Sequence, residues 1–200
     1  KSDSEQPEDK KVILLDPGAI SGNSEPDMRI VGLFADVNEE KIAEILHNML
    51  FFNELNAQNP KKAQPITFYI STYGGNADDM FAMYDMMRNI RESTAIHTVG
   101  LGKVMSAGVL MLAAGTKGQR YVGKNCRVMI HSVMGGNHGS LHNMMNEMEA
   151  IEQLQDMYCD ALIAETKLTR TKLKKMLERK VNVYLSAEEA VELGIADEII

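Results

Sequence analysis

A serine and a histidine in the middle of the chain have the types and settings needed for nucleophilic catalysis. Ser106 lies in the segment 102–108, whose Gly102, Ala107 and Gly108 are small, between a predicted strand and a predicted helix. The small neighbours keep its hydroxyl accessible, and the N–H groups of a helix N-terminus point toward developing negative charge. His131 directly follows the predicted strand 127–130, at a strand end where sites of open α/β sheets gather. These positions favour a serine nucleophile with a histidine base.

Each of these signals has another interpretation. Taken alone, the segment around Ser106 also fits a serine that caps a buried helix. The pair Gly74-Gly75 ends a predicted strand and opens a predicted helix, so it is either a tight turn or the source of an oxyanion N–H group. Lys103, three residues before Ser106, raises the alternative of a Ser-Lys hydrolase.

The histidines and cysteines do not form a metal-binding pattern. His138 and His142 lie near His131, but no Cys or carboxylate stands near them at the spacing of metal ligands, and we predict no metal site. Cys126 and Cys159 are too few for a disulfide framework. Two free thiols favour a reducing, cytoplasmic setting.

The elements that must position these residues alternate between strand and helix. We expect a helix capped by Asn38, a fully buried helix beginning near Ser106, and a helix capped by Ser186. Further predicted helices cover 77–91, the region beyond 139 and the basic stretch 167–180, and the predicted strands are 30–34, 65–70, 96–100, 119–122, 127–130 and 195–200. Such alternation with short connections is typical of βαβ units around a largely parallel sheet, so the predicted fold class is α/β.

An unusually long helix is predicted after Gly139. Its apolar residues recur at helical spacing over more than twenty positions: Met144, Met145, Met148, Ile151, Leu154, Tyr158 and Leu162. This stripe is either ordinary core or a surface that packs on a partner subunit. The basic helix 167–180 is interpreted as a solvated face.

Charge and hydropathy exclude several classes of function. The formal net charge of −7 disfavours general nucleic-acid binding, which needs an excess of Lys and Arg. No apolar run reaches the roughly 18 residues that a membrane span requires. Residues 1–28 are polar apart from a short apolar stretch at 12–15, and we expect an N-terminal arm there.

Three separated segments together resemble one family, the ClpP-type peptidases. They are the Gly74-Gly75 pair, the segment 102–108 around Ser106, and the run 113–131 that ends at His131. The segment 185–194 repeats the family's C-terminal pattern as well. The resemblance extends from about Arg29 to Ile200.

The resemblance implies a ClpP/crotonase-type α/β fold of repeated βαβ units, with a long protruding handle helix in the region of about 132–165. The peptidase domain would be 29–200, and the arm 1–28 would be mobile or axial. Two stacked heptameric rings of this chain, a tetradecamer, would cleave unfolded polypeptides that an AAA+ unfoldase of the Clp type delivers. The unfoldase would use ATP, and this chain would need no cofactor.

The resemblance also assigns site residues by position. The nucleophile falls on Ser106, the general base on His131, and the oxyanion N–H groups on Gly75 and Ala107. The segment Met134-Gly135-Gly136 would align the backbone of the substrate.

The family's third catalytic residue, an Asp, is missing. Aligned backward from Tyr184-Leu185, its place is taken by Asn182; aligned forward from the preceding residues, it is taken by Lys180, whose cation cannot orient a histidine. An Asn oxygen can accept the Nδ1–H bond of His131, but it lacks the charge that stabilises imidazolium. The expected catalytic set is therefore Ser106, His131 and Asn182.

Other family positions differ too. Tyr73 replaces a Pro, Ser132-Val133 replaces Gln-Pro after the histidine, and Ala107 replaces a Met. The smaller Ala107 would widen the primary specificity pocket and leave its backbone N–H unchanged.

Two functions therefore compete. The first is a serine endopeptidase that forms an acyl-enzyme on Ser106. The second is a catalytically weak or inactive ring subunit, comparable to the ClpR paralogues, whose role is assembly and interaction. The presence of Ser106 and His131 favours the first, and the missing Asp favours the second.

Overall fold

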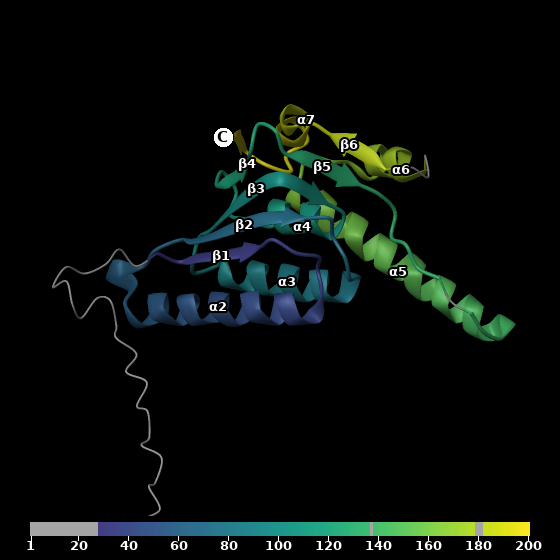
Figure 1. Ribbon diagram of the computed structural model, residues 1–200, viewed down its shortest axis with the longest axis horizontal. Coiled ribbons are helices and arrows are strands. Elements are labelled where there is room, and N and C mark those ends of the chain that lie inside the picture. The colour runs from purple at the N-terminus through teal and green to yellow at the C-terminus, as the bar shows by residue number, and fades with distance from the viewer. Residues whose placement is uncertain (1–27, 137, 179–181) are drawn as a thin grey trace, which may run out of the picture.

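The computed structural model describes residues 28–136, 138–178 and 182–200, which form an α/β structure around a seven-stranded sheet (Figure 1). The sheet order is β1-β2-β3-β4-β7, with β5 paired to β3 and β6 paired to β5. The strands are β1 Ile30–Leu33, β2 Ile66–Thr72, β3 Ile96–Met105, β4 Arg120–Val122, β5 Arg127–Ile130, β6 Val183–Leu185 and β7 Glu198–Ile199. The α/β fold class is confirmed.

The helices begin at the capping residues that the sequence indicates. Asn38 accepts a hydrogen bond from the N–H of Lys41, and Ser186 forms a capping box with Glu189. The helices are α2 Glu39–Gln58, η1 Pro60–Lys62, α3 Ala77–Ile90, α4 Ala107–Ala113, α5 Leu141–Glu165, α6 Arg170–Glu178 and α7 Ala187–Glu192. Every residue of α4 is buried, as its uniformly apolar sequence predicts. Figure 1 shows α2 and α3 along one side of the sheet.

The strands differ from the prediction in three ways. β3 continues to Met105 and is shared between two neighbours, because its first half pairs with β4 and its second half with β5. β6 was not predicted, and it pairs antiparallel with β5 in an otherwise parallel sheet. The apolar run 30–34 predicts a buried strand, but β1 is an edge strand with only one buried face: Val31 and Leu33 are buried, and Ile30 and the following Phe34 are exposed.

A buried ionic cluster fixes the C-terminal end of α5 to the body. Glu165 is 3% exposed and accepts hydrogen bonds from Arg91 at 2.6 and 3.0 Å and from the hydroxyl of Tyr84 at 3.1 Å. Lys117 lies 2.8 Å from the same carboxylate. Burial alone would oppose ionisation, but the bonds from Arg91 and Lys117 lower the pKa of Glu165 to about 2. The cluster therefore holds α5 in one position.

The N-terminal half of α5 projects beyond the rest of the molecule (Figure 1). The predicted long helix is confirmed, at 25 residues. Several of its apolar side chains are exposed: Leu141, Met144, Met145, Met148 and Met157. Most of the predicted stripe before Tyr158 is thus uncovered in a single chain, and the buried part begins there.

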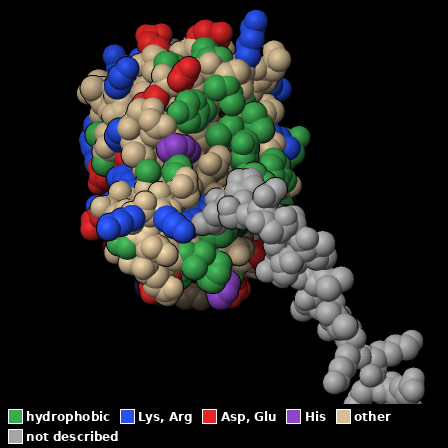
Figure 2. All heavy atoms as spheres, turned by 90° about the vertical axis from the view of Figure 1, so that its left-hand side faces the viewer, with side chains coloured by type: hydrophobic (Ala, Val, Ile, Leu, Met, Phe, Trp, Pro, Cys, Tyr) green, Lys and Arg blue, Asp and Glu red, His purple; other side chains and the backbone are tan. Residues whose placement is uncertain are grey.

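Figure 2 shows the side of the molecule at which strands β1, β2 and β3 begin. Hydrophobic side chains gather on part of this face, with acidic and basic side chains around them. Ser106 follows the other end of β3, so the site lies away from this face. Most of the predicted arm lies outside the described residues, which begin at Met28. Lys180, the alternative position for the third catalytic residue, lies in the undescribed range 179–181.

The substitution Glu165→Gln should lower the free energy of unfolding most at neutral pH. The pKa of this carboxyl is about 2 in the folded chain and about 4.5 when unperturbed, so its ionised form stabilises the fold above pH 4.5, and this stabilisation is lost as the pH falls toward 2. We expect a difference on the order of 3 kcal/mol at pH 7, reduced by about 1 kcal/mol near pH 3.5. Urea unfolding of the wild type and of Glu165→Gln at several pH values measures this difference in the free energy of unfolding. A difference that does not change with pH would contradict the assignment.

Candidate active site

The pairing of β3 with β5 places the predicted nucleophile beside the predicted base. Val104 pairs with Val128 and Met105 with Met129 in parallel register. The N–H of Ser106 extends this ladder by donating to the carbonyl of Met129 at 2.8 Å. His131 follows two residues after Met129, so the chain leaves both strands at the same edge of the sheet.

Ser106 has a backbone conformation that is rare for a residue with a side chain. Its φ is +53°, and it is the only non-glycine residue with positive φ in the described part of the chain. Its carbonyl accepts hydrogen bonds from the N–H of Val109 at 3.0 Å and from the hydroxyl of Tyr158 at 3.1 Å. Burial raises the pKa of Tyr158 well above its usual range, so the hydroxyl stays protonated and remains a donor. This sharp turn between β3 and α4 leaves the Ser106 side chain half-buried at the wall of a cleft.

The Gly74-Gly75 pair lies directly against this turn. A Cβ on Gly74, whose φ is +101°, would lie 2.6 Å from the Cβ of Ser106. Val37 donates to the carbonyl of Gly74 at 2.8 Å and accepts from the N–H of Asn76 at 2.9 Å. Because successive N–H groups of an extended strand point to opposite sides, the N–H of Gly75 points away from Val37. Among the described residues, no hydrogen bond uses this N–H.

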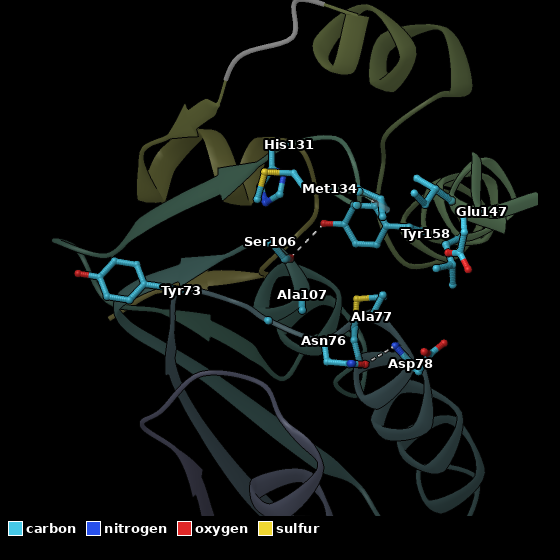
Figure 3. Close-up of a pocket in the computed structure, with 17 residues that line it drawn as sticks. Tyr73, Asn76, Ala77, Asp78, Ser106, Ala107, His131, Met134, Glu147 and Tyr158 are labelled. Carbon is cyan, nitrogen blue, oxygen red and sulfur yellow. Dashed lines mark hydrogen bonds between the residues drawn. The ribbon is translucent and has the colours of Figure 1, made fainter. Parts of the chain in front are cut away.

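Ser106 and His131 line the same cleft, of about 440 Å³ (Figure 3). Gly75, Ala107 and the loop after His131 line it too. Its remaining lining residues come from the start of α3 and from α5: Asn76, Ala77, Asp78, Met80, Glu147, Ile151, Leu154 and Tyr158, with Tyr73 at the rim. The structure thus brings together the predicted nucleophile, base and oxyanion residues.

The loop after His131 crosses the cleft toward α5. Met134 and Gly135, predicted to align the substrate, line the cleft and are exposed, Met134 at 81%. A Cβ on Gly135 would lie too close to the Cδ1 atom of Ile151 on α5, so a larger residue at this position would require that side chain to move. The loop therefore presents its backbone to the cleft.

Asn182 is exposed and directly precedes β6. The antiparallel pairing of β5 with β6 ends at Ile130 and Val183, so His131 leaves the sheet beside the residue at which the chain enters β6 from Asn182. The Nδ1 atom of His131 lies 2.5 Å from the carbonyl oxygen of Ser132, and no hydrogen bond joins His131 to Asn182 among the described residues. The role of Asn182 stays a prediction.

Lys103 lies in a different hollow. Its ammonium group is 4.6 Å from the centroid of the Tyr73 ring, a cation–π contact, and it lines a pocket with Phe34 and Asp36. It is not among the residues that line the cleft with Ser106.

Two residues of α5 that contact the site were not predicted as site residues. Tyr158 belongs to the predicted apolar stripe, but its hydroxyl donates a hydrogen bond to the carbonyl of Ser106. Gln155 donates to the sulfur of Cys159 and accepts from the N–H of Val133. One signal was available: Gln155 stands four residues after Ile151 and Tyr158 three residues after Gln155, so both polar-tipped side chains lie on the same face of the long helix as Ile151.

The described residues contain no group of three or more His, Cys, Asp or Glu side chains placed to hold a metal ion. Within the same ranges, none of the helices has the length and hydrophobicity of a membrane span.

The mostly parallel sheet thus places a serine at a strained strand-to-helix turn, a histidine at a neighbouring strand end and a cleft beside both, an arrangement that is compatible with nucleophilic catalysis. The family model described as Clp protease matches residues 25–200. The chain therefore belongs to the Clp protease family, and the recognition of a ClpP-type protease is confirmed. The family supports a peptidase that assembles into oligomers and works with Clp unfoldases in general.

The substitution Gly74→Ala should destabilise the chain more than Gly118→Ala. Both glycines have positive φ, but a Cβ on Gly118 meets nothing within 4 Å, whereas one on Gly74 meets Ser106. We expect a loss of about 1 kcal/mol at Gly118 from backbone strain and about 3 kcal/mol at Gly74, where a clash is added. Urea unfolding measures both, and equal losses would argue against close packing of Gly74 on the turn at Ser106.

Proposed function

We propose that this chain is the serine endopeptidase subunit of a self-compartmentalised, unfoldase-dependent Clp protease. The observation that carries the proposal is the strained turn that holds Ser106 in one cleft with His131. Backbone strain of this kind is concentrated at functional sites. A strained serine beside a histidine and an accessible N–H group has the nucleophile, base and oxyanion donor that acyl transfer needs.

His131 takes the proton of the Ser106 hydroxyl as the Oγ attacks the carbonyl carbon of a peptide bond. The tetrahedral intermediate collapses, the C–N bond breaks, and the amine leaves with the proton from His131. Water, deprotonated by the same histidine, then attacks the acyl-enzyme, and the ester bond to Ser106 breaks. The products are two shorter peptides, and the enzyme is regenerated.

The oxyanion of each intermediate accepts hydrogen bonds from the N–H groups of Gly75 and Ala107. Support comes from the position of both residues on the cleft wall, and from the N–H of Gly75 pointing away from its strand partner Val37. The backbone of Met134 and Gly135 pairs with the extended substrate. Their exposure in the cleft supports this role, since unpaired strand backbone is what a peptide binds.

Asn182 completes the triad as an orienting residue. Its position supports this role, because it directly precedes Val183, and Val183 pairs with Ile130, the residue before His131. The amide oxygen of Asn182 would share the single Nδ1–H of the imidazole with the carbonyl of Ser132, as the second acceptor of a bifurcated hydrogen bond.

The working enzyme is a cytoplasmic tetradecamer of two stacked heptameric rings. The exposed methionines and Leu141 on the projecting part of α5 support its role as the handle, because such an apolar surface is normally covered by another subunit. An AAA+ unfoldase of the Clp type delivers unfolded polypeptides to the chamber and hydrolyses the ATP. The chain itself needs no cofactor.

A catalytically weak or inactive ring subunit is the second candidate. The specific observation that favours it is the exposed Asn182, which stands in place of a carboxylate and makes no hydrogen bond to His131 in the described structure. Covalent labelling separates the two candidates.

A fluorophosphonate probe should label the wild-type protein and leave Ser106→Ala unlabelled. The probe needs an activated serine, so His131→Ala should reduce the labelling rate by about 10²-fold. Ser71→Ala, which changes a serine outside the cleft, is the matched control and should label as the wild type does. Wild-type labelling no faster than that of Ser106→Ala would establish the inactive candidate.

Asn182→Ala should lower kcat/KM for a fluorogenic peptide by about 5- to 10-fold, the equivalent of one hydrogen bond of about 1 kcal/mol. Asn182→Asp should raise it above the wild-type value, because a carboxylate also stabilises the imidazolium that forms in the transition state. Steady-state kinetics of the assembled protein measures both. If Asn182→Ala has the same kcat/KM as the wild type, Asn182 is not part of the triad.

A further inference from the structure

The peptide bond between Ser132 and Val133 makes contacts at both of its polar ends. Its carbonyl oxygen lies 2.5 Å from the Nδ1 atom of His131. Its N–H donates to the side-chain oxygen of Gln155 at 2.7 Å. The bond is trans and planar, so its C=O and N–H groups point in opposite directions and turn together. Fixing the N–H therefore fixes the direction of the carbonyl.

The carbonyl contact decides which nitrogen of His131 carries the proton. A carbonyl oxygen only accepts, so Nδ1 must be the donor in the neutral ring. The Nε2 atom is then left with a free lone pair, which is the form that can take a proton from Ser106. The direction of one peptide group thus sets the tautomer of the base.

Gln155 is itself held in one orientation. Its amide nitrogen donates to the sulfur of Cys159 at 3.2 Å, one helical turn further along α5, so its oxygen is directed at Val133. Cys159 is buried, and the neighbouring Tyr158 binds the carbonyl of Ser106. The side chain of Gln155 therefore extends from a part of α5 that is already fixed to the site.

We propose that Gln155 is a positioning residue for His131, acting through the Ser132–Val133 peptide. The sequence agrees with this role, because Val133 stands where the resemblance places a proline. A proline has a fixed φ and no N–H, whereas Val133 has both a freer backbone and a donor that needs an acceptor. Gln155 supplies that acceptor. The inference rests on the proposed function, since it concerns the base of that reaction.

The test compares three substitutions in the assembled protein. Gln155→Leu removes the acceptor, and Gln155→Glu retains an oxygen that can accept from Val133. Gln153→Leu is the matched control, because Gln153 is exposed on the same helix and its side chain makes no hydrogen bond among the described residues. We expect Gln155→Leu to lower kcat for a fluorogenic peptide about tenfold with KM changed less than about twofold, and Gln155→Glu to recover most of this loss.

Hydrogen exchange provides a readout that does not depend on catalysis. The amides of segment 132–136 should exchange faster in Gln155→Leu than in the wild type, and at the wild-type rate in Gln153→Leu. Exchange of the rest of the chain should be unchanged.

The outcomes separate this inference from the proposed function. If fluorophosphonate does not label the wild type, the proposed peptidase function is overturned. Hydrogen exchange of segment 132–136 then still tests whether Gln155 holds the Ser132–Val133 peptide. If the wild type is labelled, equal kcat values for the two leucine variants overturn the positioning role. A loss in Gln155→Leu that Gln155→Glu does not reverse, accompanied by faster exchange across α5, would be a general destabilisation and would also overturn it.

Discussion

The parallel pairing of β3 with β5 is the interaction on which the site depends. This register places Ser106 beside Ile130 at the end of the two strands. If the pairing shifted by one residue, the side chains at the strand ends would point to the opposite face of the sheet. The φ of +53° at Ser106 costs about 1–3 kcal/mol, and the chain offsets it with hydrogen bonds to both backbone groups of that residue. The strain persists because β5 holds its N–H and Tyr158 holds its carbonyl. Gly74 leaves the space in which this turn fits.

One face of α5 supports this arrangement at three points. Ile151, Gln155 and Tyr158 follow one another at spacings of four and three residues, and they contact the loop after His131 and the turn at Ser106. Glu165 fixes the end of the helix through a buried ionic cluster. The N-terminal half of α5 presents exposed methionines. A subunit that packs on those methionines would therefore act on the same helix that shapes the cleft.

Local sequence signals predicted most of the fold and only part of the site. The caps at Asn38 and Ser186, the buried α4 and the length of α5 follow from periodicity and capping chemistry, which involve near neighbours. The extension of β3 depends on its pairing with two different strands on one side. The antiparallel β6 and the contact of Gln155 with Val133 join residues 22 to 57 positions apart, and no local pattern encodes such pairs. The strand-to-helix position of Gly75 left a tight turn and an oxyanion N–H group as alternatives, and Ala107 was assigned by resemblance alone; both residues line the cleft.

The partner of the His131 Nδ1 atom in the structure is a neutral carbonyl, and this changes what the geometry must provide. The carboxylates that line the cleft among the described residues are Asp78 and Glu147, both exposed, and neither is bonded to His131. The imidazole is therefore oriented by neutral dipoles instead of a charge. The attraction of a dipole falls faster with distance and depends on direction, so a small shift of a carbonyl removes a larger fraction of its attraction than the same shift of a carboxylate. A site of this kind needs a rigid peptide group beside the histidine, and Gln155 on an anchored helix provides that rigidity.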